Sequence, residues 1–133
     1  MDLGLKGLRA LVSGGTKGIG RAVAGLLANE GASVAICARD EGEVKATAAD
    51  LQAGGVSVYG QALDVSDGPS LKSWVESAAG SLDGLDIVVA NVSALAINND
   101  EESWLQGFEV DMMHSVRMVE AAMPWLEKST AAS

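Results

Sequence analysis

The stretch from Leu11 to Gly20 reads LVSGGTKGIG, an apolar strand that runs into a glycine-rich turn and then directly into a helix. Its glycines at Gly14, Gly18 and Gly20 leave no Cβ where a diphosphate has to approach the backbone. The amides of the following helix's first turn and the helix dipole favour negative charge at the same place. The stretch therefore predicts a phosphate cradle with the spacing G-x-x-x-G-x-G, a variant of the common dinucleotide fingerprint G-x-G-x-x-G.

Strands and helices alternate on either side of this turn. Short apolar or alternating runs predict strands at 8–13, 33–38, 56–63 and 85–90. Segments with an apolar side predict helices at 18–30, 41–53, 66–80 and 100–128. This order predicts an α/β fold, a three-layer, Rossmann-type doubly wound parallel sheet with strand order 3-2-1-4. Ligands of such sheets bind at the carboxyl ends of the strands, where the order reverses.

A complete doubly wound sheet has about six strands. The 133 residues provide only four, so we expect a single domain over 1–133 whose sheet is truncated after the last helix. The fourth strand is then expected to be an exposed edge.

Composition and charge limit the classes of function. Eighteen acidic and nine basic residues give a net charge of −9, which argues against nucleic acid and anionic membranes as partners. No apolar stretch reaches the length of a membrane span and the N-terminus lacks a signal-peptide pattern, so we expect a cytoplasmic protein. Cys37 is the only cysteine, which excludes an intrachain disulfide, and we expect its side chain to be buried.

Two basic residues near the glycine turn indicate which dinucleotide binds. Ala38 stands where an acidic residue would accept the ribose 2′-hydroxyl of NAD, and Arg39 follows with a guanidinium suited to the 2′-phosphate of NADP. Lys17 in the turn adds a second positive charge. We therefore expect NADP(H) to be preferred over NAD(H). In the alternative, Arg39 is a solvated loop residue paired with Asp40 or Glu43.

The ends of the third and fourth strands supply further candidate contacts. Asp64 can accept a hydrogen bond from the adenine amino group while the amide of Val65 serves a ring nitrogen, although Asp64 also suits an Asx turn or helix cap. Asn91 follows the fourth strand and is placed to brace the backbone near the cofactor.

These motifs together resemble the short-chain dehydrogenase/reductase family, and within it the 3-oxoacyl-carrier-protein reductases. Ser13–Gly20 matches the family's TGxxxGxG, Leu63–Val65 its adenine contact, Leu85–Asn91 the strand that ends in NNAG, and 100–104 the start of its fifth helix. The resemblance implies hydride transfer between NADP(H) and a small carbonyl or alcohol, and a homo-oligomer. The cofactor-binding residues expected from the turn and the resemblance are Gly14, Thr16, Lys17, Gly18, Ile19, Gly20, Arg39, Asp64, Val65 and Asn91.

The chain also departs from the family pattern. Residues Ala90–Ser93 read ANVS where the family has NNAG. In the family, an Asn on the fifth helix helps to hold a water of the proton relay; Asp111 stands at that position and is the one candidate catalytic residue. An aspartate cannot donate as an amide does, which weakens that relay. The family's catalytic Ser, Tyr and Lys lie beyond its fifth helix. Here the sole tyrosine, Tyr59, has Leu63 at the position of the lysine.

Two interpretations follow from these departures. In the first, the chain is the N-terminal, cofactor-binding part of an NADP-dependent reductase, inactive alone, with the catalytic part missing or on a second chain. In the second, the chain is a non-catalytic dinucleotide-binding module or an inert fragment.

The last helix carries two other features. Asp111 and His114 are three residues apart on one helix face, which suits a metal or acid–base pair but more often forms a simple hydrogen-bonded pair, and we expect no metal site. Large apolar residues surround the helix, so one side is expected to cover the sheet and the other to meet a partner subunit, unless it is simply a thick core helix. These residues are Trp104, Phe108, Met112, Met113, Val116, Val119, Met123 and Trp125.

Overall fold

A computed structural model describes all 133 residues of the chain. The strands are β1 (Arg9–Ser13), β2 (Ser33–Ala38), β3 (Val58–Ala62) and β4 (Ile87–Val89). The helices are α1 (Gly18–Asn29), α2 (Glu41–Gln52), α3 (Gly68–Leu82), α4 (Glu101–Gln106), the π-helix η1 (Gly107–Met113) and α5 (His114–Leu126). None of them combines the length and the apolar character that crossing a membrane would need.

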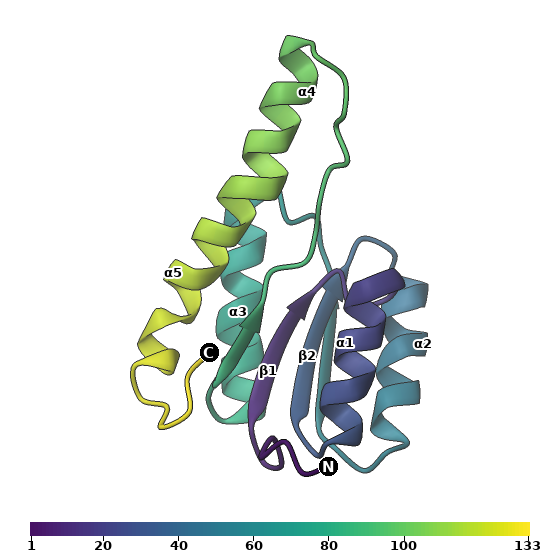
Figure 1. Ribbon diagram of the computed structural model, residues 1–133, viewed down its shortest axis with the longest axis vertical. Helices are drawn as coiled ribbons and strands as arrows, with labels where there is room; N and C mark the ends of the chain where they lie inside the picture. Colours follow the sequence, from purple (N-terminus) through teal and green to yellow (C-terminus); the bar gives the residue numbers. More distant parts are fainter.

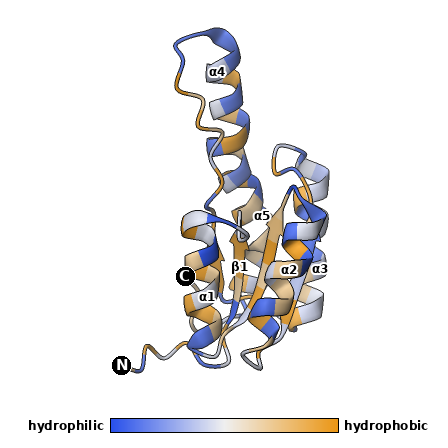
Figure 2. Ribbon diagram, turned by 90° about the vertical axis from the view of Figure 1, so that its right-hand side faces the viewer, coloured by the Kyte–Doolittle hydropathy of each residue, from blue (hydrophilic) through white to orange (hydrophobic).

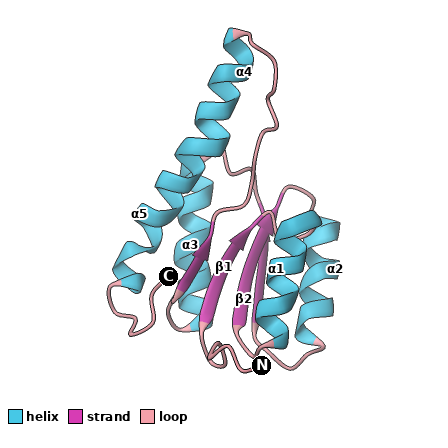
Figure 3. Cartoon of the chain, in the orientation of Figure 1, coloured by secondary structure: helices cyan, strands magenta, loops and turns pink.

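The four strands form one parallel sheet in the order β3-β2-β1-β4, as predicted (Figure 3). Helices α1 and α2 cover one face, and α3 and α5 cover the other (Figure 1). The two outer strands are shorter than the sequence predicts. Pairing sets β3 at Val58–Ala62 rather than 56–63 and β4 at Ile87–Val89 rather than 85–90, because an outer strand extends only as far as its neighbour pairs with it.

Each face of the sheet has its own apolar core because side chains alternate along a strand. On β1, Leu11 belongs to the core under α3 and α5, whereas Val12 belongs to the core under α1 and α2. Trp74 is the largest fully buried side chain of the first core. Cys37 is buried in the same core, as expected, and this burial raises the pKa of its thiol to about 12.

The helix predicted over 100–128 is not one regular α-helix. It is interrupted by the π-helical stretch η1 and ends near Leu126, with Pro124 inside α5. The expectation that the eight apolar residues named above are buried is wrong. Six of them are exposed, with Trp104 at 71%, and Met113 and Trp125 are half-buried, whereas Met118 and Ala122, which were not among them, are fully buried. The reason is geometric: α5 packs on α3 and β4, whereas α4 and η1 extend beyond the carboxyl ends of the strands (Figures 1 and 2).

The outer edge of β4 is partly covered. The amide of Val88 donates to the carbonyl of Ser133 at 2.9 Å, and the amide of Ser133 donates to the carbonyl of Asp86 at 2.8 Å. The expectation of a bare edge is therefore wrong at this point, because the backbone of the last residue pairs with the strand.

An ion pair joins the beginnings of β1 and β4. Asp86 Oδ2 accepts from the amide of Arg9 at 2.9 Å and from its Nε at 2.8 Å, while Oδ1 accepts from Ser129 Oγ at 2.6 Å. The Asp86 side chain is only 4% exposed. Hydrogen bonds from Arg9 lower the pKa of this carboxyl to about 2, so it is ionised at neutral pH.

Candidate functional site

The glycine-rich turn after β1 has the backbone geometry that the sequence predicts. Gly14 and Gly18 have φ angles of +66° and +53°, in the left-handed region that favours glycine. A Cβ on Gly20 would overlap the carbonyl oxygen of Gly14 and Nδ2 of Asn91. The turn, the start of α1 and the end of β4 are thus in close contact, and only glycine fits between them.

The start of α1 leaves its first amides available. Lys17 is the N-cap residue, but its side chain makes no capping hydrogen bond. By contrast, aspartates cap α2, α3 and α4 with side-chain hydrogen bonds. Because the orphan amides of a helix start attract anions, α1 is the helix of this protein best prepared to receive a phosphate group.

A cleft of about 620 Å³ opens beside this turn, at the carboxyl ends of β1, β2 and β3. Six of the predicted cofactor-binding residues line it, namely Gly14, Thr16, Lys17, Arg39, Asp64 and Val65. Gly18, Ile19 and Gly20 are outside the lining and form the first turn of α1, where the Ile19 side chain is 76% exposed. Asn91 lies behind the turn, with Nδ2 donating to the carbonyl of Gly14 at 3.4 Å.

The positive charges of the cleft differ in their partners. Lys17 Nζ is 2.8 Å from Glu43 Oε1, a contact that raises the pKa of the lysine. Arg39 makes no ion pair within the chain. The ion pair of Arg39 with Asp40 or Glu43 is therefore absent, because Asp40 caps α2 and Glu43 holds Lys17, but Arg39 is exposed, as that alternative also expected.

Asp64 forms the Asx turn that the sequence allowed as its alternative role. Its Oδ1 accepts from the amide of Ser66 at 2.9 Å and from Ser66 Oγ at 2.7 Å, and these bonds lower the pKa of the carboxyl. Neither bond uses Oδ2. The turn therefore orients the carboxylate at the rim of the cleft and leaves one oxygen for a donor from a ligand.

Asp111 and His114 do not form the pair that their spacing suggests. Asp111 Oδ1 accepts from the amide of Ala94 at 2.7 Å, which ties η1 to the loop after β4. His114 is fully buried, and its Nε2 lies 2.8 Å from Ser13 Oγ. The prediction is wrong because the π-helical stretch turns less per residue than an α-helix, so the two side chains point to different neighbours. No group of three or more His, Cys, Asp or Glu side chains is placed to hold a metal ion.

Some residues of the cleft were missed by sequence reasoning. Gln106 and Val110 reach it from α4 and η1, and Ser93 and Ala94 from the loop after β4. No local signal marks these residues, because their positions depend on how the last helix crosses the sheet. The contact between Ser13 and His114, 101 residues apart, was missed for the same reason.

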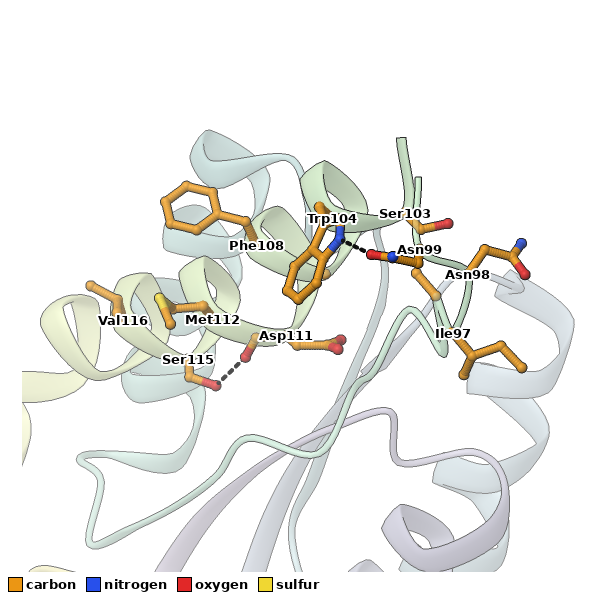
Figure 4. A pocket seen from close by; sticks show the side chains of 12 residues that line it. Ile97, Asn98, Asn99, Ser103, Trp104, Phe108, Asp111, Met112, Ser115 and Val116 are labelled. Carbon is orange, nitrogen blue, oxygen red and sulfur yellow. Dashed lines mark hydrogen bonds between the residues drawn. The ribbon is translucent and has the colours of Figure 1, made fainter. Parts of the chain in front are cut away.

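A second cavity, of about 880 Å³, lies between the loop 96–99 and the last helix (Figure 4). Trp104 lines this cavity between the helix and the loop, and its Nε1 donates to Asn99 Oδ1 at 3.0 Å. Asp111 also lines this cavity, and Ala94, whose amide donates to Asp111, lines the first cleft. The lining is largely apolar, as expected for a surface that holds a carbon skeleton or a protein partner.

Comparison with known proteins gives one consistent result. A family model described as short chain dehydrogenase matches residues 9–133. Isoepoxydon dehydrogenase of Penicillium expansum is 39% identical over 136 residues, which cover 100% of this chain and 52% of that protein. Dehydrogenase/reductase SDR family member 4 of Sus scrofa is 35% identical over 124 residues, 90% of this chain and 44% of its own.

Solved structures agree with this result. The crystal structure of L-sorbose reductase from Gluconobacter frateurii, complexed with NADPH and L-sorbose, superimposes with a TM-score of 0.87 at 31% identity. The match covers 96% of this chain and 51% of the reductase. The chain thus spans about half the length of the relatives it matches.

Proposed function

The chain belongs to the short-chain dehydrogenase family, and from this membership we propose that it is the NADP(H)-binding part of an oxidoreductase. The observation that carries the proposal is the uncapped start of α1, which opens beside a cleft with Lys17 and Arg39 on its rim. An anionic dinucleotide suits this arrangement of free amides and positive charge.

Each part of the cleft has a role in this proposal. The amides of Gly18–Gly20 receive the diphosphate, and Thr16 lines the path that leads there. Lys17 and Arg39 receive the 2′-phosphate, and Asp64 and Val65 receive the adenine. When bound, the cofactor supplies or accepts a hydride.

The substrate in this proposal is a small carbonyl or alcohol, of the 3-oxoacyl reductase type that the motifs resemble. Relatives named isoepoxydon dehydrogenase and L-sorbose reductase support a small oxygenated substrate. The proton donor comes from outside these 133 residues, since Tyr59 donates to Gln61 Oε1 within β3 at 3.0 Å, away from the cleft. Asp111 holds the loop after β4 in place and thereby shapes the substrate side of the site.

Titration with NADPH and NADH tests the cofactor proposal. The wild-type chain is expected to bind NADPH more tightly, and Lys17→Glu with Arg39→Asp is expected to remove that preference. Because both contacts to the 2′-phosphate are charge-assisted, losing them is expected to lower the affinity for NADPH by about tenfold or more. Lys45→Glu is the matched control, because Lys45 pairs with Glu41 on α2 and does not line the cleft. An unchanged preference in the double variant would remove both residues from the site.

A second candidate function is a dinucleotide-binding module without catalysis. It is favoured by Asp111, whose carboxylate is engaged by the Ala94 amide and cannot donate a proton-relay hydrogen bond as an amide would. Intact mass of the protein from its natural source, combined with a turnover assay, separates the two functions. A species near 13.5 kDa without turnover would support the module. A longer chain, or a second chain that brings the Ser, Tyr and Lys, would support the oxidoreductase.

The exposed side of the last helix provides the partner surface in this proposal, and the partner is a second copy of the chain. Trp104, Phe108 and Met112 recur at intervals of four residues and are 71%, 50% and 58% exposed. Covering such a surface excludes water from apolar groups. Sedimentation velocity is expected to show an oligomer for wild type and a smaller species for Met112→Glu. Gln52→Glu on α2 is the control, and a monomeric wild type would contradict this part of the proposal.

A further inference from the structure

His114, the only histidine of the chain, is fully buried where η1 meets α5, and the proposed contacts with the cofactor do not use it. Both of its ring nitrogens are engaged. Nδ1 lies 3.0 Å from the carbonyl oxygen of Val110, and Nε2 lies 2.8 Å from Ser13 Oγ. A buried imidazole with two specific partners needs one defined protonation state.

The partners determine that state. The carbonyl of Val110 can only accept, so Nδ1 carries the proton and Nε2 of the neutral ring is an acceptor. Ser13 therefore donates its hydroxyl proton to Nε2 at 2.8 Å, since its other acceptor, the carbonyl of Val89, is 3.4 Å away. Ser13 Oγ then accepts from the amide of Asn91 at 3.0 Å. Donation therefore runs in one direction, from the Asn91 amide after β4 through Ser13 on β1 to His114 and Val110 on the last helix.

The end of this series touches the phosphate cradle. Asn91 Nδ2 donates to the carbonyl of Gly14 at 3.4 Å, and Gly20 has no room for a Cβ because Gly14 O and Asn91 Nδ2 occupy that space. A shift of the Asn91 backbone would therefore move the contact between β4 and the glycine turn. Ser13 and Asn91 therefore connect the position of His114 to the shape of the glycine turn.

The surroundings of the ring favour the neutral state. Burial lowers the pKa of His114, opposed by the Val110 carbonyl and by the charge of Asp111 on η1. The other elements around it bring no charge, because the buried side chains of α3 are apolar and β4 is Ile-Val-Val. On β1 the sole charged residue, Arg9, stands at the opposite end of the strand from Ser13.

We propose that His114 is a positioning residue for cofactor binding: its Nε2 orients the Ser13 hydroxyl, and Ser13 in turn holds Asn91 against the glycine turn. Through these contacts the last helix helps to hold the glycine turn in the shape that binds the dinucleotide. This inference rests on the proposed function, because its consequence is measured as affinity for NADPH.

Two substitutions separate positioning from packing. His114→Gln places an amide oxygen near the position of Nε2 and keeps an acceptor for Ser13, but loses the bond to Val110. His114→Asn keeps a donor for Val110 and loses the bond to Ser13. His114→Asn is expected to weaken NADPH binding about fivefold to tenfold, the size of one neutral hydrogen bond, whereas His114→Gln is expected to stay within about twofold of wild type. Thermal unfolding of both variants, measured separately, reports the packing cost.

The opposite results would overturn the proposal. If His114→Asn bound NADPH as wild type does, or if both variants lost affinity in proportion to their stability, His114 would be a packing residue only. If the wild-type chain bound neither NADPH nor NADH, the proposed function would fall, and this inference with it. If wild type bound and His114→Asn bound equally well, only this inference would fall.

A measurement on the unmodified chain decides the case if the variants do not fold. Because the chain has one histidine, its imidazole ¹⁵N signals are assigned without ambiguity. The proposal expects a protonated Nδ1, an unprotonated Nε2, and a shift of the Nε2 signal when NADPH saturates the protein. A protonated Nε2 in the free chain at neutral pH, or no change of either signal on saturation, would overturn it.

Discussion

The body of the molecule, formed by residues 1–91 and α5, differs from the arm formed by residues 92–113. The body contains two apolar cores and nearly all of the buried side chains, whereas Ser103 is the only buried residue of the arm. Hydrogen bonds such as those from Trp104 to Asn99 and from Ala94 to Asp111 connect the arm internally. A regular sequence pattern therefore does not ensure burial, since a helix is covered only where another element crosses it.

Two tryptophans test this difference most strongly. Trp74 of the body is fully buried and Trp104 of the arm is 71% exposed. Trp74→Ala is expected to lower the free energy of unfolding by about 3–5 kcal/mol through lost burial and a cavity, and Trp104→Ala by less than about 0.5 kcal/mol. Urea unfolding at a protein concentration that keeps the chain monomeric measures both. Equal losses of unfolding free energy in the two variants would contradict the difference in burial between body and arm.

Substitution of Asp86 tests how much its ionised carboxylate, which lies at the start of β4 and is bound to Arg9, stabilises the body. Its pKa is about 2 in the folded protein and about 3.9 when unfolded, so ionisation stabilises the fold by about 2–3 kcal/mol above pH ~5. Because the folded pKa is depressed, this contribution is lost as the pH falls from about 4 toward 2. Asp86→Asn is expected to lower stability at neutral pH and to flatten its decline in that acid range. Unfolding curves from pH 7 to pH 2 measure this effect, and an unchanged slope would contradict it.

The glycine turn of the body borders the cleft. Alanine substitution there tests whether the close backbone contacts of the turn leave room for a side chain. A Cβ on Gly20 would overlap Gly14 O, whereas a Cβ on Gly80 in α3 meets nothing within 4 Å. Gly20→Ala is expected to cost about 1–3 kcal/mol and to weaken NADPH binding. Gly80→Ala is the control and is expected to be neutral or to stabilise by about 0.5–1 kcal/mol. Similar behaviour of the two variants in unfolding and NADPH titration would show that the cradle tolerates a side chain.

The smallest expected effect lies at the rim of the cleft, which body and arm line together. Glu43 holds Lys17 at 2.8 Å and has to release it when a 2′-phosphate binds there. Glu43→Gln is expected to strengthen NADPH binding by about twofold to fivefold, the range of an exposed ion pair, and to leave NADH binding unchanged. Glu41→Gln, which alters a pair outside the cleft, is the control. Equal gains for both dinucleotides would show that Glu43 does not act on the 2′-phosphate.

Local sequence patterns predicted most of the body. The runs at Leu8–Ser13 and Ser33–Ala38 indicated strands, the second of them covered on both faces, and the glycine spacing located the turn and the start of α1. The Asx turn at Asp64 was also visible as an alternative. These features depend on residues close in sequence, so the chain itself shows them.

Contacts between distant segments could not be predicted in this way. The partners of Lys17, Asp111 and His114 each lie in another element, and no local pattern selected them. The π-helical stretch shifted the face of the last helix and sent Asp111 to the loop and His114 to Ser13. The exposure of Trp104 depended on where that helix leaves the sheet.

The order of the elements, the parallel sheet and the glycine turn before α1 therefore follow from the amino-acid sequence, because side-chain periodicity and glycine backbone freedom act over a few residues. The tertiary structure alone decided which charges remain available in the cleft, which apolar side of the last helix is left open, and that His114 is linked to Asn91 through Ser13. These depend on distances between residues far apart in the chain, which are set only when the helices pack on the sheet.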